Sequence, residues 1–306
     1  MSNVGVAVVG AAGWGKNVVR AFSHASGASL RGVCDLRPEL LARVATAHPG
    51  VRLTRSFDDL LSDPEIAAVA LAVDSGNHHR LARRALEAGR HVFVEKPLAL
   101  TVADSEELCR VAERNRRTLM VGHLLLYHPA ILVAKRALDA GDLGQARYLH
   151  SQRVNLGVVR STENAWWSLA PHDIAVAMFL LGSAPTTVSA TGGCFLQAEA
   201  QIDDVAFATL RWPDGRVAHI HVSWIDADKR RSLTIVGSLG SLTIDGTAPV
   251  AREQEPLRVE CEHFIECVRT GSRPRSDGAQ GVAVVRVLEA GERSMRAGGA
   301  PIAIGA

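Results

Sequence analysis

The chain has 306 residues, which is long enough for two domains that each bury a core of their own. Hydrophobic residues make up 47% and charged residues 22%, a composition typical of ordinary globular proteins. The 34 Lys and Arg residues nearly balance the 32 Asp and Glu residues, and no long run of one sign occurs. Nucleic acid and anionic membranes are therefore not expected as partners.

The sequence also lacks targeting, anchoring and metal motifs. The stretch from Met1 to Gly15 has no basic segment ahead of its apolar run, which argues against a signal peptide. No apolar run approaches the roughly 18 residues of a membrane-spanning helix. The five cysteines are scattered, without Cys-x-x-Cys or a Cys/His spacing that suits zinc. We therefore expect a reduced, cytoplasmic protein without a metal site.

The first predicted element is a strand at Val4 to Val9, whose small apolar and β-branched residues suit burial on both faces. It runs into a turn in which Gly10 and Gly15 hold the outer positions of the G-x-G-x-x-G dinucleotide fingerprint. Ala12 holds the middle position, where glycine lets the backbone approach a pyrophosphate, and Gly13 beside it can restore some of that freedom. The helix that follows offers amide donors and a positive dipole end to a diphosphate.

The second predicted strand, Ser29 to Cys34, ends at Asp35, which stands 20 residues after Gly15. This is the spacing expected for the acid that binds the adenosine ribose of a dinucleotide. A carboxylate there repels a 2′-phosphate, so the sequence favours NAD, while Arg37 nearby keeps NADP open. Asp35 is also typical of a turn before Pro38, and the two roles are compatible.

Strands and helices continue to alternate as far as Gly122. The predicted segments are a helix at Pro38 to Ala47, a strand at Val51 to Leu53, a helix capped by Ser56, a strand at Ile66 to Val73, a helix at His79 to Ala88, a strand at Val92 to Val94, a helix from Thr101 through Asn115 and a strand at Leu119 to Val121. This alternation implies right-handed βαβ units and a doubly wound parallel sheet. We expect a Rossmann domain over residues 1–122.

Glu95-Lys96-Pro97 directly follows the strand Val92 to Val94. Pro97 restricts Lys96 to an extended backbone, so the lysine side chain leaves the carboxyl end of the strand at a fixed angle. Ligands bind at that edge of an open parallel sheet. A lysine held there can stabilise the alkoxide that forms as a hydride leaves a substrate hydroxyl. For the isolated tripeptide, the alternative is a surface lysine that merely ends a strand.

Beyond Gly122 the pattern changes to longer strands with antiparallel turn signals. Helices are predicted at Pro129 to Ala140, Pro171 to Leu181, Glu260 to Arg269 and Gly278 to Met295, and strands at Ala146 to Leu156, Thr187 to Gly192, Asp204 to Trp212, Val217 to Ile225, Ser232 to Val236 and Ser241 to Ile244. The expected fold class is α/β, with the Rossmann domain followed by an α+β domain over residues 123–306. Its large, mainly antiparallel open sheet would pair subunits into a homodimer or homotetramer.

Together these motifs resemble the Gfo/Idh/MocA oxidoreductase family nearly end to end. The resemblance is carried by the turn ending Trp14-Gly15-Lys16-Asn17, Glu95-Lys96-Pro97, Gly122-His123 with Tyr127-His128-Pro129, the run Trp167 to Asp173 and the strand Ala218 to Trp224. Within the family, the set is most similar to the bacterial UDP-N-acetylglucosamine and UDP-N-acetyl-aminoglucuronate 3-dehydrogenases. It implies an NAD(P)-dependent enzyme that moves a hydride between a sugar hydroxyl, at C3 of a nucleotide sugar, and nicotinamide.

By the same resemblance, Lys96 and His172 are the catalytic residues. Pro171 suits the first helical position, which predicts His172 in the first turn, where the helix dipole keeps its imidazole neutral. The expected cofactor contacts are Gly10, Ala12, Gly13, Trp14, Gly15, Asp35, Arg37, Val73, Asp74, Asn77, His78, Glu95, Lys96 and Pro97. The expected substrate contacts are Tyr127, Arg153, Asn155, Arg160, Trp167 and His172.

Two departures from the family pattern leave alternatives open. Ser168 stands four residues before His172, where many members carry Asp, and Val73-Asp74 replaces the Thr-Pro that relatives often have. One alternative is a reductase for keto-sugars in deoxysugar or antibiotic biosynthesis, because the same groups catalyse both directions. The other is a dinucleotide-binding sensor without turnover, which Ala12, Asp74 and Ser168 support.

Overall fold

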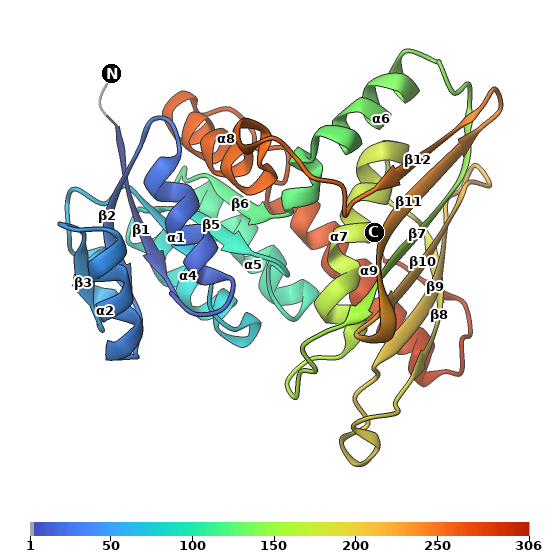
Figure 1. The fold of residues 1–306 in the computed structure, drawn as a ribbon, viewed down its shortest axis with the longest axis horizontal. Helices are drawn as coiled ribbons and strands as arrows, with labels where there is room; N and C mark the ends of the chain where they lie inside the picture. The colour runs from blue at the N-terminus through green and yellow to red at the C-terminus, as the bar shows by residue number, and fades with distance from the viewer. Residues whose placement is uncertain (1–2, 306) are drawn as a thin grey trace. The chain divides into compact units, whose positions relative to one another are not determined.

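The computed structural model describes residues 3–305, so residues 1, 2 and 306, at the ends of the two predicted domains, lie outside it. The chain forms two compact units, each built on one sheet (Figure 1). Unit 1 is Met1–Tyr127 with Arg252–Val282, and unit 2 is His128–Ala251 with Ala283–Ala306. The sequence predicts one boundary after Gly122, whereas the chain returns to unit 1 at Arg252. Within the described residues, no helix is long and apolar enough to cross a membrane.

Unit 1 contains a six-stranded parallel sheet with the order β3-β2-β1-β4-β5-β6. Its strands are β1 (Val4–Val9), β2 (Ala28–Cys34), β3 (Arg52–Thr54), β4 (Ala68–Leu71), β5 (His91–Glu95) and β6 (Leu119–Gly122). The strand order reverses between β1 and β4, which is the point where dinucleotides bind in sheets of this topology. The predicted doubly wound parallel sheet is confirmed.

The helices of unit 1 cover this sheet, and two of them begin at a side-chain cap. They are α1 (Gly15–His24), α2 (Pro38–Ala47), α3 (Phe57–Leu61), α4 (His78–Glu87), α5 (Val102–Arg114) and α8 (Pro256–Thr270), with the 3-10 turns η1 (Ser75–Asn77), η2 (Leu124–Tyr127) and η4 (Arg252–Gln254). The hydroxyl of Ser56 accepts from the Asp59 amide, and that of Thr101 from the Asp104 amide. The predicted Ser56 cap is therefore confirmed, and Thr101 caps the helix that was predicted to start there.

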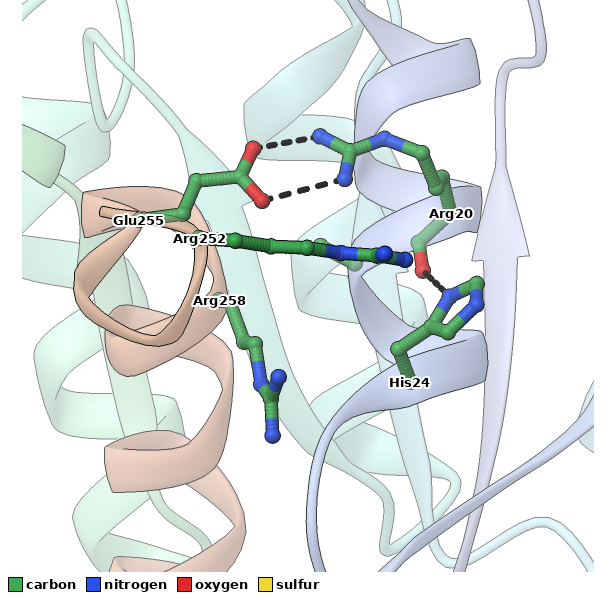
Figure 2. A pocket seen from close by; sticks show the side chains of 6 residues that line it. Arg20, His24, Arg252, Glu255 and Arg258 are labelled. Atoms are coloured by element: carbon green, nitrogen blue, oxygen red, sulfur yellow. Dashed lines mark hydrogen bonds and ion pairs between the residues drawn. The ribbon is translucent and has the colours of Figure 1, made fainter. Parts of the chain in front are cut away.

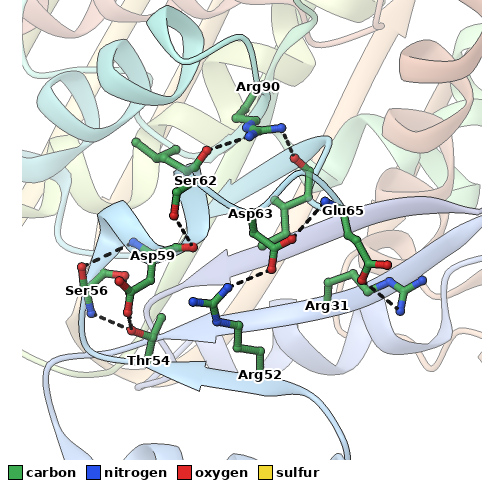
Figure 3. A network of polar contacts seen from close by, with 11 residues as sticks. Arg31, Arg52, Thr54, Ser56, Asp59, Ser62, Asp63, Glu65 and Arg90 are labelled. Atoms are coloured by element: carbon green, nitrogen blue, oxygen red, sulfur yellow. Dashed lines mark hydrogen bonds and ion pairs between the residues drawn. The ribbon is translucent and has the colours of Figure 1, made fainter.

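Polar contacts fasten the loop after α3 to the edge of the sheet (Figure 3). Arg52 on β3 donates to Asp63 at 2.9 Å. Arg90 donates from its two terminal nitrogens to the carbonyls of Leu61 and Ile66, each at 2.6 Å. Leu61 is the last residue of α3, so the bond from Arg90 satisfies a carbonyl that this short helix leaves without an intrahelical partner.

Helix α8 comes from late in the chain and packs against α1 in the core of unit 1. The fully buried rings of Phe22, Phe93 and Phe264 meet edge to face, with centroids 5.7, 5.8 and 6.1 Å apart. Burying each such ring is worth roughly 1.5–3 kcal/mol. At the surface of the same helix pair, Arg20 forms a forked ion pair with Glu255, beside a small pocket that Arg252 and other residues line (Figure 2).

Unit 2 contains a seven-stranded sheet with the order β12-β11-β7-β10-β9-β8-β13. Its strands are β7 (Ala146–Leu156), β8 (Thr187–Gly193), β9 (Val205–Arg211), β10 (Val217–Ser223), β11 (Ile225–Gly237), β12 (Ser241–Asp245) and β13 (Ile302–Ala303). The β7–β10 pair is parallel and the other pairs are antiparallel, which confirms a mainly antiparallel sheet. The sequence analysis missed β13 and the first half of β11.

The helical elements of unit 2 are α6 (Pro129–Asp139), α7 (Ala165–Leu181), the 3-10 turn η3 (Ala198–Ala200) and most of α9 (Gly278–Arg296). Helix α7 packs on strands β7, β9 and β10. It starts at Ala165, where the Asn164 side chain accepts from the Trp167 amide, so the predicted start at Pro171 is wrong. Proline normally breaks a helix interior. Here α7 is buried along most of its length, and this burial outweighs the local cost of Pro171.

Candidate active site

The glycine-rich turn lies between β1 and α1 of unit 1, and its backbone leaves no room for side chains at two positions. Gly10 has φ +92°, and a Cβ there would lie 2.4 Å from the Ala72 carbonyl oxygen. A Cβ on Gly15 would lie 2.2 Å from the Gly10 carbonyl oxygen. At Gly13, in contrast, a Cβ would meet nothing within 4 Å. This tight turn leads directly into the N-terminus of α1, an arrangement that suits a diphosphate.

Asp35 lies at the end of β2 and holds this turn. Its Oδ2 accepts from the Ala11 amide at 2.8 Å, and its Oδ1 accepts from the Arg37 amide at 3.0 Å and from the Arg37 Nε at 3.2 Å. Burial raises the pKa of Asp35, but the hydrogen bonds from Ala11 and Arg37 outweigh burial and leave it below its ordinary value. An ionised carboxylate beside the turn fits ribose hydroxyls, while pairing with Asp35 occupies the Arg37 guanidinium.

The loop after β4 carries the other predicted cofactor contacts. His78 is buried and joins this loop to the end of β5, with Nδ1 2.7 Å from the Pro97 carbonyl oxygen and Nε2 3.0 Å from that of Val73. Asp74 is exposed, and the Asn77 side chain accepts from Arg80 at 3.0 Å. The structure therefore brings the Val73, His78 and Pro97 positions together at one edge of the sheet.

Glu95-Lys96-Pro97 follows β5 at the same edge. Glu95 is only 7% exposed, and its Oε1 accepts from the Trp14 indole nitrogen at 2.8 Å. A Cβ on Gly122 would come within 3.0 Å of the Glu95 Oε2. Burial raises the pKa of Glu95 to about 7, opposed by the Trp14 hydrogen bond and the Lys96 charge. Lys96 is half-buried and precedes a cis proline.

His123 adds a neutral ring near Lys96. It is 1% exposed, and both ring nitrogens lack a hydrogen-bond partner among the described residues. Burial, followed by the positive charge of Lys96, lowers the pKa of His123 to about 3. The sequence analysis quoted His123 within a motif but gave it no role.

In unit 2, His172 lies on α7 in the interior of the helix. It follows Ala165 by seven residues, so the predicted position in the first turn is wrong and the helix-dipole argument for its neutrality does not apply. Ser168 lies one turn earlier on the same helix and is 5% exposed. His172 is half-buried, while its neighbour Asp173 is 2% exposed.

Asp173 binds Arg153 of β7, one of the predicted substrate contacts. The Arg153 Nε lies 2.6 Å from Oδ2 and its Nη2 lies 3.4 Å from Oδ1. Arg231 of β11 lies opposite Arg153 in the sheet and donates to the Asn155 side chain at 3.4 Å. Burial and the Arg153 charge lower the pKa of Arg231. The sequence analysis missed Arg231 because it started this strand at Ser232, and it missed Asp173 although this residue follows His172 directly.

The remaining predicted substrate contacts have local partners. Trp167 is 7% exposed and donates to Glu292 at 3.0 Å. Tyr127, in unit 1, is 1% exposed, with its hydroxyl 2.9 Å from the His263 Nδ1. Arg160 is exposed and pairs with Glu163 at 3.1 Å. Substrate contacts at these positions stay predictions.

Family models match both halves of the chain. The model described as "Oxidoreductase family, NAD-binding Rossmann fold" (GFO_IDH_MocA) matches residues 4–123, and the GFO/IDH/MocA C-terminal domain model matches residues 131–243. The chain belongs to the Gfo/Idh/MocA family. It is therefore an oxidoreductase of the class that acts on CH–OH groups with NAD. The glycine-rich turn and the N-terminus of α1 fit the diphosphate of that cofactor, and the Asp35 carboxylate fits its ribose hydroxyls.

Curated relatives of this family member differ in their substrates. An inositol 2-dehydrogenase from Saccharopolyspora erythraea is 29% identical, covering 98% of this chain and 95% of the relative. A UDP-N-acetylglucosamine 3-dehydrogenase from Acidithiobacillus ferrooxidans is also 29% identical, covering 85% and 88%. The WlbA dehydrogenase from Bordetella pertussis, solved with NADH and UDP-GlcNAcA, shares the fold with a TM-score of 0.89 at 23% identity, covering 100% and 99% of the two chains.

Proposed function

We propose that this Gfo/Idh/MocA member oxidises a ring hydroxyl of a nucleotide sugar, at C3, with NAD as the hydride acceptor. The observation that carries the choice of substrate is the charge of the Arg153, Asp173 and Arg231 cluster. Two cross-strand arginines face a single carboxylate, so one positive charge remains without a partner of opposite sign within this cluster. A diphosphate or a uronate carboxylate would pair with it, whereas a neutral polyol would not.

In this proposal, Lys96 donates a hydrogen bond to the reacting oxygen and stabilises its developing negative charge. His172 accepts the hydroxyl proton, as a general base. When bound, NAD supplies the acceptor for the hydride. Arg153 and Arg231 hold the anionic part of the substrate, which fixes the position of the sugar ring. The same groups serve the reverse reaction, the reduction of a keto-sugar.

The test follows NADH or NADPH formation with NAD and NADP in parallel. The substrates are UDP-N-acetylglucosamine, its glucuronate analogue, free N-acetylglucosamine and myo-inositol, with an aminotransferase present to remove a 3-keto product. Activity with NAD and a UDP-sugar supports the proposal. Activity with myo-inositol alone contradicts the nucleotide-sugar assignment, and cofactor binding without turnover in either direction favours a sensor.

Arg231→Met provides a sharper test of the charge argument. It removes the surplus positive charge but leaves the Arg153–Asp173 pair in place. We expect the KM for a UDP-sugar to rise about tenfold or more, as for one lost charge-assisted contact. Arg230→Met, which removes an exposed neighbour paired with Asp228, is the matched control. Equal effects of the two substitutions would contradict a role for Arg231 in binding.

We further propose that the open face of the unit 2 sheet joins two copies of the chain. Along β9, the buried Ala206 and Ala208 flank Phe207, which is 42% exposed and stacks on His221 at 4.3 Å. Because successive side chains of a strand point to opposite faces of the sheet, Phe207 lies on the face opposite to the one that buries Ala206 and Ala208. Light scattering should show a dimer or tetramer that Phe207→Glu dissociates, whereas a monomeric wild-type protein would contradict the proposal.

A further inference from the structure

The indole of Trp14 makes a long-range hydrogen bond that a role in the glycine-rich turn alone does not require. Trp14 directly precedes α1, and its side chain is 45% exposed, so burial of the ring contributes little to fixing it. Its Nε1 nevertheless donates to the Glu95 Oε1 at 2.8 Å. The bond therefore ties the turn after β1 to the last residue of β5, 81 positions further along the chain.

The order of the strands places this bond across the end of β4. Strand β4 pairs with β1 on one side and with β5 on the other. Neighbouring strands lie about 4.8 Å apart, so the bond connects two strand ends that are roughly 10 Å apart. The order reverses between β1 and β4, where dinucleotides bind in sheets of this topology. Trp14 thus links the turn that fits a diphosphate to the strand end that carries Lys96.

The Glu95 carboxylate is held from two further directions. Gly122 lies opposite Glu95 in the sheet, and a Cβ on it would come within 3.0 Å of Oε2 and 3.2 Å of Oε1. A side chain at residue 122 would therefore press on the carboxylate. The backbone amide of Lys96 also donates to this carboxylate. A displacement of the Glu95 side chain would consequently disturb the backbone of Lys96 itself.

The bond from Trp14 also favours the ionised form of Glu95. Burial raises the pKa of Glu95 to about 7, and the Trp14 bond is the largest effect that opposes this rise, ahead of the Lys96 charge. The other titratable groups at this place are Glu260 and Cys261 of α8 and His123 after β6. Burial shifts the pKa of each of these three groups toward its neutral form. Lys96 is therefore the charged partner of the Glu95 carboxylate.

We propose that Trp14 is a positioning residue whose indole N–H holds the Glu95 carboxylate, and through it Lys96, in place relative to the turn that receives the dinucleotide. This inference rests on the proposed function only through the catalytic role of Lys96, and it holds for any CH–OH substrate. A misplacement of about 1 Å at a reacting group can cost on the order of 100-fold in rate. One hydrogen bond thus sets the site of the cofactor and the catalytic amine together.

Trp14→Phe tests the proposal, because it keeps a ring in the turn and removes the N–H donor. We expect kcat for the substrate that the NAD assay identifies to fall about tenfold, with a Kd for NADH within about twofold of wild type. The acid limb of the kcat profile should move to higher pH, since loss of the bond raises the pKa of Glu95.

Trp212→Phe is the matched control. It removes an indole hydrogen bond of the same kind, 3.0 Å long, to the Ser183 carbonyl in unit 2. We expect it to leave kcat and its pH profile unchanged. Equal kcat values and equal pH profiles in the Trp14→Phe and Trp212→Phe variants would overturn the proposal.

A second measurement needs no turnover and separates this inference from the proposed function. In a ¹H–¹⁵N correlation spectrum, the Trp14 indole signal is the one that Trp14→Phe removes. It should shift with pH around a midpoint of about 7, as Glu95 titrates. In Glu95→Gln, where an amide oxygen still accepts the bond, this shift should disappear. A shift that survives in Glu95→Gln overturns the proposal even if a sugar is oxidised. If no sugar is turned over, its loss still supports the Trp14–Glu95 link, and the failure concerns the proposed function alone.

Discussion

Asp173 accepts two hydrogen bonds from Arg153 inside unit 2, at 2.6 Å from Nε and 3.4 Å from Nη2, with side chains only 3% and 8% exposed. This forked pair joins the helix that carries His172 to strand β7. It fixes the backbone next to His172, and it turns an arginine predicted only as a substrate contact into a structural anchor as well. The pair therefore links the stability of unit 2 to the position of its candidate base.

Asp173→Asn should strongly destabilise the protein. The substitution leaves the Arg153 charge buried without its carboxylate, next to Arg231, and breaking such a pair typically costs about 3–5 kcal/mol. Urea unfolding measures the loss. The double variant Arg153→Met/Asp173→Leu should recover much of it, because no buried charge remains. A loss below about 1 kcal/mol for the single variant would contradict this account.

Gly10→Ala should weaken NAD binding far more than Gly13→Ala. Both glycines have positive φ, +92° at Gly10 and +48° at Gly13, so either substitution strains the backbone, and the strain is larger at Gly10. A Cβ at residue 10 would collide with the Ala72 carbonyl oxygen, whereas at residue 13 it would meet open space. Calorimetric titration of NAD gives the two affinities, with thermal unfolding to check that each variant folds. Similar losses of NAD affinity for the two variants would show that backbone strain, and not the collision with the Ala72 carbonyl, causes the weaker binding.

Lys96→Ala should lower turnover by orders of magnitude and leave NADH affinity nearly intact. The amine stabilises charge that develops only during the reaction, so its loss affects kcat much more than ground-state binding. Lys96→Arg is the control that keeps the charge but changes its geometry. NADH fluorescence gives the affinity and steady-state assays give the rate. Full activity of Lys96→Ala would refute the central role of this residue.

His123 should make the protein acid-sensitive. Its folded pKa of about 3 lies below the ordinary value of 6.5, so the unfolded chain binds a proton that the folded protein does not. The stability contribution of the neutral ring is complete above about pH 6.5 and is lost as the pH falls toward 3. His123→Leu should therefore gain stability relative to wild type across that window, measured by urea unfolding at several pH values. A stability difference between His123→Leu and the wild-type protein that does not change with pH would contradict this account of His123.

Much of unit 1 is predictable from the sequence because its signals are local. The predicted bounds of Val4 to Val9 and Pro38 to Ala47 are those of β1 and α2. Alternating strands and helices imply a parallel sheet, and carboxyl ends of parallel strands meet at one edge, which brings Asp35 and Lys96 to that edge. The catalytic roles of Lys96 and His172 stay predictions.

Only the tertiary structure decided how distant segments meet. Proline propensity places the start of a helix at Pro171, yet burial of α7 against its sheet extends the helix back to Ala165 and moves His172 out of the first turn. The Arg153–Asp173 ion pair and the Phe93–Phe264 ring contact join elements with no shared local pattern, because packing across a core brings together residues far apart in the chain. The sequence alone determined which chemical groups stand at the strand ends. Long-range burial, which disfavours the charged form of a side chain, then shifted the pKa of groups such as Glu95 and His123.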